Sequence, residues 1–244
     1  GFELLTKNLP LFKNVKYILS PYSSYEGLDL ELLKSMGIKY RNNSGANSPS
    51  IAQYAFTTMF MLLSRIPELS QLKSTADGSI LGEEYAGKTA GIIGMGRVGN
   101  DILNNLNKLG IQTEYYNRSE KNVDAKRVEF DEIFKNDIVF ISIASNEETK
   151  ALFQSISNLI QPHSYLIDIS ATDDLYDKKR VVEMLNDDKL RGFALEVFDP
   201  ESFNPASSKN FIATPHIAWC TVDAERRTVK NYLQRALDII EGKE

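Results

Sequence analysis

Short apolar runs alternate with longer helical patterns from Lys88 onward. Between the first two runs, apolar residues recur at helical spacing from Val98 to Leu109, and Gly110 ends that pattern. Strands that alternate with helices are joined by right-handed crossovers, so the pattern predicts an α/β fold with a mostly parallel sheet. The expected strands are Thr89–Ile93, Ile111–Tyr115, Ile138–Ile143, Leu166–Ile169, Phe193–Val197 and Phe211–Ala213.

The segments before Lys88 and from Thr221 onward contain fewer expected strands than the segment between them. Ser48 and Pro49 are a good helix start, with serine as N-cap and proline at the first helical position. The tail from Thr221 predicts a helix with an apolar side between Tyr232 and Ile240. The other expected elements are strands over Lys16–Ser20 and Ile38–Arg41, a long buried helix from Ser48 to near Pro67, and a polar connection over Gln71–Glu84.

Net charge, the longest apolar stretch and the cysteine count limit the kinds of protein that this chain can be. The formal net charge of −5 is spread along the 244 residues, so no basic block indicates nucleic-acid binding. The most apolar stretch, Ile51–Leu63, is shorter than the ~20 residues that span a bilayer, and we expect no membrane association. Cys220 is the single cysteine, which excludes an internal disulfide and fits a cytoplasmic protein.

The strongest local motif is the glycine-rich segment between the first expected strand and its helix. Gly94, Gly96 and Gly99 form a G-x-G-x-x-G pattern. In such a turn the first glycine permits a tight bend, the second lets the backbone approach a pyrophosphate, and the third allows close helix packing. Amides near Arg97 and Val98 would then face the phosphates, which predicts a Rossmann-type dinucleotide-binding domain.

The end of the next strand bears on cofactor choice. An acidic residue there would hold the ribose hydroxyls of NAD. This chain has Asn117, Arg118 and Ser119 instead, and an arginine with a hydroxyl donor suits the 2′-phosphate of NADP. We therefore expect NADP (NADPH) to be favoured over NAD, although a solvated loop arginine is the alternative interpretation.

Further motifs lie on both sides of the glycine turn. They are Asn42–Asn47 followed by Ala52–Tyr54, Ala86–Thr89 before the turn, Glu148–Thr149, and the Thr-Pro-His-Ile sequence within Thr214–Trp219. In order and spacing these segments resemble the D-isomer-specific 2-hydroxyacid dehydrogenase family, with a C-terminal signature like that of the glycerate-dehydrogenase branch.

The resemblance implies a domain organisation. A Rossmann-type, doubly wound parallel sheet (residues 82–214) would be inserted in a smaller, flavodoxin-like substrate domain (residues 1–81 and 215–244). That substrate domain is expected to be N-terminally incomplete, because the family has several elements before the Lys16–Ser20 strand. The resemblance also implies a homodimer built on the Ile51–Leu63 helix, with core packing alone as the alternative.

The resemblance also implies site residues. His216 falls on the family's catalytic histidine, and Glu201 on the glutamate that supports it. Ser23 and Ser24 fall on the loop that binds the substrate carboxylate, and no metal is expected. Further cofactor contacts are expected at Ile143, Ala144, Thr149, Ile169, Ser170, Glu196, His216 and Ala218.

One departure from the family pattern bears on activity. Ala171 stands where the family has a substrate-binding arginine, and Asp173 and Asp174 follow it. Alanine cannot make a bidentate contact to a carboxylate, and the two acids would repel an anionic substrate. We expect an NAD(P)-dependent oxidoreductase acting on a 2-hydroxy or 2-keto acid or a related carbonyl. The alternative is a catalytically impaired nucleotide sensor or scaffold protein.

Overall fold

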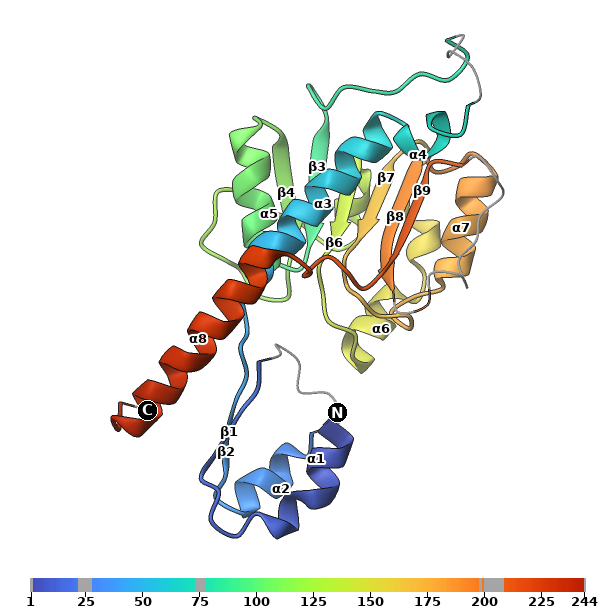
Figure 1. Cartoon of the computed structure of the whole chain (residues 1–244). Coiled ribbons are helices and arrows are strands. Elements are labelled where there is room, and N and C mark those ends of the chain that lie inside the picture. Colours follow the sequence, from blue (N-terminus) through green and yellow to red (C-terminus); the bar gives the residue numbers. More distant parts are fainter. Residues whose placement is uncertain (1, 22–27, 73–77, 198, 200–208, 244) are drawn as a thin grey trace. The chain divides into compact units, whose positions relative to one another are not determined.

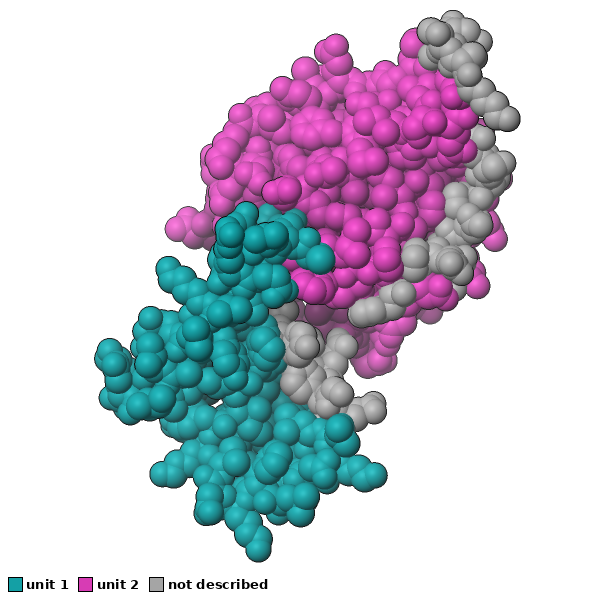
Figure 2. Space-filling model, in the orientation of Figure 1, with its two compact units in different colours: residues 1–50, 220–244 teal, residues 51–219 magenta. Residues whose placement is uncertain are grey.

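The computed structural model describes residues 2–21, 28–72, 78–197, 199 and 209–243. The chain forms two compact units, residues 1–50 with 220–244 and residues 51–219, which Figure 2 colours separately. The helix α3 (Ser48–Leu63) packs on the sheet of the larger unit through Ala52, Ala55 and Met59, so this unit begins earlier than the boundary expected after residue 81.

A seven-stranded parallel sheet forms the centre of the larger unit (Figure 1). Its strand order is β5-β4-β3-β6-β7-β8-β9, and every neighbouring pair is parallel. The chain runs outward from β3 to β5 and then returns to β6, so the order reverses between β3 and β6. The strands are β3 (Thr89–Ile93), β4 (Gln112–Tyr116), β5 (Lys126–Arg127), β6 (Ile138–Ile141), β7 (Tyr165–Asp168), β8 (Gly192–Val197) and β9 (Phe211–Pro215).

Helices cover both faces of this sheet (Figure 1). Alternate strand residues face opposite sides, so Ile92 and Phe140 pack in one core with α3 and α5, while Ile93 and Ile141 pack in the other with α6 and α7. The fold is therefore the expected doubly wound α/β sheet of Rossmann type. Besides α3, the covering helices are α5 (Arg97–Lys108), α6 (Glu147–Phe153) and α7 (Lys178–Asn186), with short 3-10 turns over Glu132–Lys135 and Ile156–Asn158.

The structure differs locally from the sequence prediction. The long helix ends at Leu63, before the expected end near Pro67, because Arg65 adopts a left-handed φ of +53°. A short helix α4 (Ile66–Leu69) follows, and Pro67 fits its first turn, where a missing N–H costs nothing. The strand β5 was not predicted, since its two residues Lys126 and Arg127 are both charged and exposed.

The smaller unit contains a two-stranded parallel sheet of β1 (Tyr17–Leu19) and β2 (Lys39–Arg41). Its core consists of Leu9, Leu28, Leu33 and Ile38. Its helices are α1 (Phe2–Asn8), α2 (Leu30–Ser35) and α8 (Val222–Ile240), with a 3-10 turn over Leu9–Leu11.

The C-terminal helix α8 is tied to the smaller unit by polar contacts. The side-chain amide of Asn43 donates to the carbonyl oxygen of Thr228 (2.9 Å), and Arg227 Nε donates to that of Ala46 (2.7 Å). The expected apolar side of this helix stays largely exposed, for example at Leu233. Among the described residues no helix is long and apolar enough to cross a membrane.

Candidate functional site

The glycine turn joins β3 to α5 at the point where the strand order reverses. Gly94 has a φ of +96°, and a Cβ on it would lie 2.1 Å from the carbonyl oxygen of Ser142. A Cβ on Gly99 would lie 2.1 Å from the carbonyl oxygen of Gly94. A Cβ on Gly96, in contrast, would meet nothing within 4 Å. The turn therefore leaves open space at the N-terminus of α5, where the amides of Arg97–Val98 fit a dinucleotide pyrophosphate.

The loop after β4 is fixed to this turn. Asn117 accepts a hydrogen bond from the backbone N–H of Met95 (3.1 Å) and donates to the carbonyl oxygen of Ser119 (2.8 Å). Arg127 donates to the carbonyl oxygens of Asn117 (3.0 Å) and Arg118 (3.3 Å). The expected ribose-side residues therefore lie together at the carboxyl end of β4, with a second arginine, Arg127, beside them.

The side chain of Arg118 has an acidic neighbour. Its guanidinium lies 2.8 Å from the carboxylate of Glu148 on α6, and the side chain is 81% exposed. An exposed ion pair of this kind contributes little to stability, so the guanidinium can exchange one anionic partner for another. Arg118 and Arg127 place two cationic groups at this loop.

The loop after β6 carries Ile143 and Ala144. The Thr149 hydroxyl donates to the carbonyl oxygen of Ala144 (2.9 Å) and accepts from the backbone N–H of Asn146 (2.9 Å). The Asn146 side chain in turn accepts from the backbone N–H of Thr149, which completes a capping box at the start of α6. Thr149 is buried, so in this structure it shapes the loop that carries Ile143 and Ala144.

The carboxyl end of β7 contains a buried ion pair that shapes the next loop. Asp168 and Lys178 have fully buried side chains, and their charged atoms lie 3.0 Å apart. Asp168 also accepts from the hydroxyls of Ser170 (2.5 Å) and Tyr176 (2.8 Å), and Lys178 donates to the carbonyl oxygen of Thr172. Burial raises the pKa of Tyr176 well above its usual value. Through these contacts the buried pair anchors the loop over residues 169–177.

Ala171 belongs to this loop and has an unusual backbone conformation. Its φ of +53° is in the left-handed region, which L-residues rarely adopt. Backbone strain of this kind often marks functional positions. The loop thus places residue 171 in a strained conformation, but the alanine presents no charge.

Asp174 belongs to a polar cluster that links the loops after β6 and β7. Its carboxylate lies 2.7 Å from Lys150 Nζ and accepts from the hydroxyls of Thr172 (2.6 Å) and Ser145 (2.8 Å). The hydrogen bond from Lys150, aided by these hydroxyls, holds the pKa of Asp174 well below its usual value. Lys150 balances this charge, so Asp174 repels an anion less than the sequence suggested.

A carboxyl and an imidazole meet at the carboxyl ends of β8 and β9. Glu196 is 2% exposed; its Oε1 accepts from the backbone N–H of Ala218 and lies 4.0 Å from His216 Nδ1. Burial raises the pKa of Glu196 to about 7; the Ala218 N–H opposes this shift, and the charge of Asp168 adds to it. Burial also lowers the pKa of His216 below its usual value. Glu196 can therefore change protonation near neutral pH.

Comparisons with known proteins show which family the chain belongs to. The family profile for "D-isomer specific 2-hydroxyacid dehydrogenase, NAD binding domain" matches residues 56–218. The chain belongs to this family. It is 27% identical over 229 residues to a hydroxypyruvate reductase of Thermotoga maritima, covering 88% of this chain and 74% of that protein.

Solved structures share the fold. A D-lactate dehydrogenase from Aquifex aeolicus, complexed with NAD and lactic acid, superposes with a TM-score of 0.80 at 21% identity, covering 97% of this chain and 79% of the other. An acyclic imino acid reductase in complex with NADPH and D-Arg superposes with a TM-score of 0.83 at 24% identity, covering 93% and 76%.

As a member of the 2-hydroxyacid dehydrogenase family, the protein is a nicotinamide-dependent oxidoreductase, and the expectation of an enzyme is supported over that of a sensor or scaffold. The expected cofactor residues that the structure describes all lie at or just after the carboxyl ends of β3, β4, β6, β7, β8 and β9, or on the helix that follows. Glu201, Ser23 and Ser24 lie outside the described residues, so their roles stay predictions.

Some residues that shape the site were missed from the sequence. In the sequence, Lys150 and Lys178 resemble ordinary helix charges, and Arg127 resembles a surface charge. Their partners Asp174 and Asp168 come from other elements, and Arg127 binds backbone atoms of another loop. The signal available was weak: Lys178 begins the basic run Lys178–Arg180, and nothing in that run indicates that its first lysine is buried.

Proposed function

We propose that the protein reduces a 2-keto acid or a related carbonyl compound with NADPH, and oxidises the corresponding 2-hydroxy compound in reverse. The observation that carries this proposal is the position of His216, which follows β9 at the same sheet edge as the glycine turn. When bound, the nicotinamide ring supplies or accepts the hydride. Steady-state oxidation of NADPH with a panel of 2-keto acids tests the proposal.

His216 would move the proton in this reaction. An imidazole has the intrinsic pKa needed for proton transfer near neutral pH. Glu196 lies 4.0 Å from its Nδ1 and can orient the ring, and Glu201 is proposed as the second supporting carboxylate. Protonated His216 would donate to the substrate oxygen during reduction, and neutral His216 would accept that proton during oxidation.

NADP is proposed as the preferred cofactor. Arg118 and Arg127 lie at the loop after β4, where Asn117 replaces the acidic residue that would bind the ribose hydroxyls of NAD. The 2′-phosphate would take the place of the Glu148 carboxylate beside the Arg118 guanidinium. Ser119 adds a hydroxyl at the same loop.

NADPH is expected to bind more tightly than NADH, and Arg118→Ala should reduce this difference. Loss of one charged hydrogen bond should weaken NADPH binding by ~1.5–3 kcal/mol and leave NADH binding nearly unchanged. Calorimetric titration of both cofactors measures this. Arg180→Ala, which removes another exposed arginine paired with a glutamate, is the matched control. Equal affinities of the wild-type protein for NADPH and NADH would refute the cofactor preference.

A second candidate substrate class follows from Ala171. An iminium carbon–nitrogen bond carries its own positive charge, so its reduction needs no arginine to stabilise a developing oxyanion. The carboxylate of Glu196, when it is ionised, would attract rather than repel it. The acyclic imino acid reductase with the same fold binds NADPH and D-Arg, which makes this chemistry a reasonable alternative substrate class for this chain.

A cytoplasmic homodimer is proposed for the assembly. Most apolar residues of α3 already pack on the sheet, but Phe60 remains 37% exposed, and α8 adds an exposed apolar side. Light scattering at micromolar concentration is expected to give twice the mass of 27.5 kDa. A monomer under these conditions would overturn this part of the proposal.

A further inference from the structure

The edge strand β9 leads directly into His216, and its position therefore decides where the imidazole lies. In the described part of the sheet β9 pairs only with β8, so no backbone ladder fixes its outer side. His216 follows the last residue of this strand and has a left-handed φ of +50°. A residue keeps such a conformation only where the surrounding structure imposes it, so the end of β9 must be held by other contacts.

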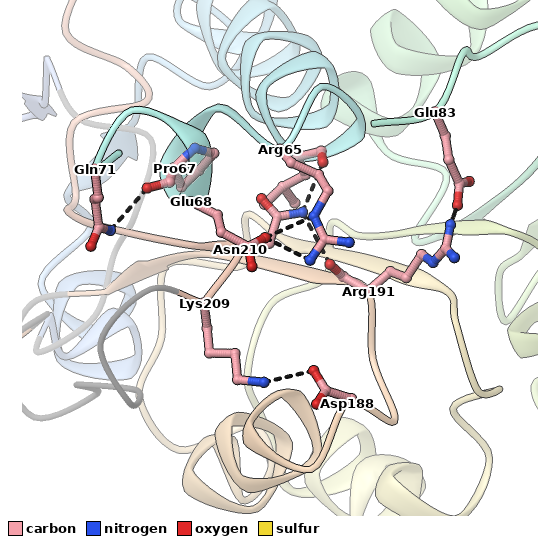
Figure 3. A network of polar contacts seen from close by, with 10 residues as sticks. Arg65, Pro67, Glu68, Gln71, Glu83, Asp188, Arg191, Lys209 and Asn210 are labelled. Atoms are coloured by element: carbon pink, nitrogen blue, oxygen red, sulfur yellow. Dashed lines mark hydrogen bonds and ion pairs between the residues drawn. The ribbon is translucent and has the colours of Figure 1, made fainter. Parts of the chain in front are cut away.

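Two side-chain contacts join α3 to β9, one at each end of the strand. At the carboxyl end, the hydroxyl oxygens of Tyr54 and Thr214 lie 2.6 Å apart and share a hydrogen bond. At the amino end, Asn210 Nδ2 donates to the carbonyl oxygens of Leu62 (2.8 Å) and Arg191 (3.0 Å) (Figure 3). The helix therefore holds the strand at both ends.

The spacing of these two contacts agrees along both elements, which run in opposite directions. Tyr54 and Leu62 are eight residues apart on α3, a distance of about 12 Å at ~1.5 Å per helical residue. Thr214 and Asn210 are four residues apart, a distance of about 13 Å at ~3.3 Å per strand residue. Both contacts can therefore form at once, and together they set the position of β9 along the helix.

The backbone on both sides of His216 is fixed to the same part of the sheet. The N–H of His216 donates to the carbonyl oxygen of Thr214 (3.0 Å), so the turn begins at the residue that Tyr54 contacts. Beyond the histidine, the N–H of Ala218 donates to Glu196 Oε1. Glu196 and Thr214 are paired in register, so their side chains lie on one face of the sheet, the face that α3 covers. His216 thus lies between two anchored residues.

The hydroxyl of Tyr54 stays uncharged and can be removed without loss of packing. Burial raises the pKa of Tyr54 to about 12; the hydrogen bond with Thr214 opposes this shift, and the charges of Glu196 and Asp168 add to it. The contact with Thr214 therefore does not change while His216 titrates. The ring packs against the apolar core between α3 and the sheet, so a phenylalanine would keep that packing.

We propose that Tyr54 is a positioning residue for His216: its hydroxyl holds Thr214, and through it the strand end that presents the imidazole to the substrate. The inference rests on the proposed role of His216 in proton transfer. Misplacement of a reacting group by about 1 Å can cost ~10²-fold in rate, so one hydroxyl away from the chemistry can have a measurable effect.

Tyr54→Phe is expected to lower kcat for a 2-keto acid about tenfold and to leave the dissociation constant of NADPH unchanged. Thr214→Val should give the same loss, and the double variant should lose no more than either single variant, because both remove one contact. Thr214→Ser keeps a hydroxyl and should retain most of the wild-type kcat. Tyr165→Phe, the control, removes a tyrosine hydroxyl from the first residue of β7, at the opposite edge of the sheet.

These kinetic measurements can contradict the positioning role in three ways. An unchanged kcat with Tyr54→Phe in an active protein would show that the hydroxyl does not affect His216. Losses that multiply in the double variant would show that Tyr54 and Thr214 act separately. An equal loss with Tyr165→Phe would show that removal of any buried tyrosine hydroxyl slows the enzyme.

A measurement without turnover separates the positioning role from the proposed function. NMR of the two histidine rings of the whole protein gives the pKa of His216, with His163 as the internal reference. Burial lowers the pKa of His216, so a ring held less firmly in Tyr54→Phe should titrate closer to its ordinary value, while the signals of His163 stay unchanged. Such a shift in a protein that reduces no 2-keto acid would support the positioning role and contradict the proposed function. An unchanged titration of His216 would overturn the positioning role, whether or not the wild-type protein is active.

Discussion

The His216→Ala variant is expected to keep most of its affinity for NADPH and to lose about 10²–10⁴-fold in turnover, because removal of a general acid–base group has effects of this size. His216 lies at the carboxyl end of β9, 4.0 Å from the buried Glu196, and the glycine turn that would hold the cofactor is a separate segment. Steady-state kinetics and calorimetric titration measure the two properties. His163→Ala is the matched control, and it should turn over at the wild-type rate.

The pH dependence of turnover gives a second readout of the same variant. Reduction requires protonated His216, and burial lowers the pKa of this group. The rate of reduction should therefore be highest below this pKa and should fall as the pH rises through it. That pH-dependent limb should vanish in His216→Ala; its survival in the variant would assign the proton transfer to another group.

Wild-type turnover of simple 2-keto acids such as hydroxypyruvate is expected to be poor, and Ala171→Arg should raise it. Removal of one preorganised donor from a developing oxyanion costs about 10²–10³-fold in turnover, and this chain lacks the family's arginine there. Residue 171 already has a φ of +53°, so arginine would meet the same backbone strain that alanine tolerates. Ala171→Leu, which adds bulk without charge, is the control and should give no gain.

Two outcomes of this experiment separate the substrate classes. Ordinary turnover of a 2-keto acid by the wild-type protein would show that another residue replaces the arginine, and would contradict our interpretation of Ala171. Faster NADPH oxidation when a 2-keto acid is supplied with ammonia or an amine would favour the iminium substrate. In that case Ala171→Arg should slow the reaction, since it places a positive charge beside a positive substrate.

Much of the large unit could be predicted because its signals are local. The apolar runs gave the strands β3, β4, β6, β7, β8 and β9 to within a few residues, and the G-x-G-x-x-G pattern identified the turn at Gly94. Collision of a Cβ at Gly94 with Ser142 explains why that signal is specific, since two loops approach each other there. The family motif around His216 similarly located the end of β9.

Other features depend on contacts between distant segments and leave little trace in the sequence. The buried Asp168–Lys178 pair requires a lysine of α7 to fold beneath the preceding loop. The balance of Asp174 by Lys150 joins two different loops. The end of α3 depends on the left-handed backbone conformation of Arg65. An arginine in the sequence does not predict that conformation.

Transfer of deuterium from cofactor to product tests the central claim most directly, because it detects hydride transfer even when turnover is slow. The protein is incubated with NADPH deuterated at C4 of the nicotinamide, in either stereochemical position, and with a 2-keto acid alone or with an amine. Mass spectrometry of the product should show deuterium at C2 with the wild-type protein, and on a 2-keto acid alone about 10²-fold less label with His216→Ala. Absence of label with the wild-type protein on every substrate, or equal label with His216→Ala on a 2-keto acid alone, would contradict the account.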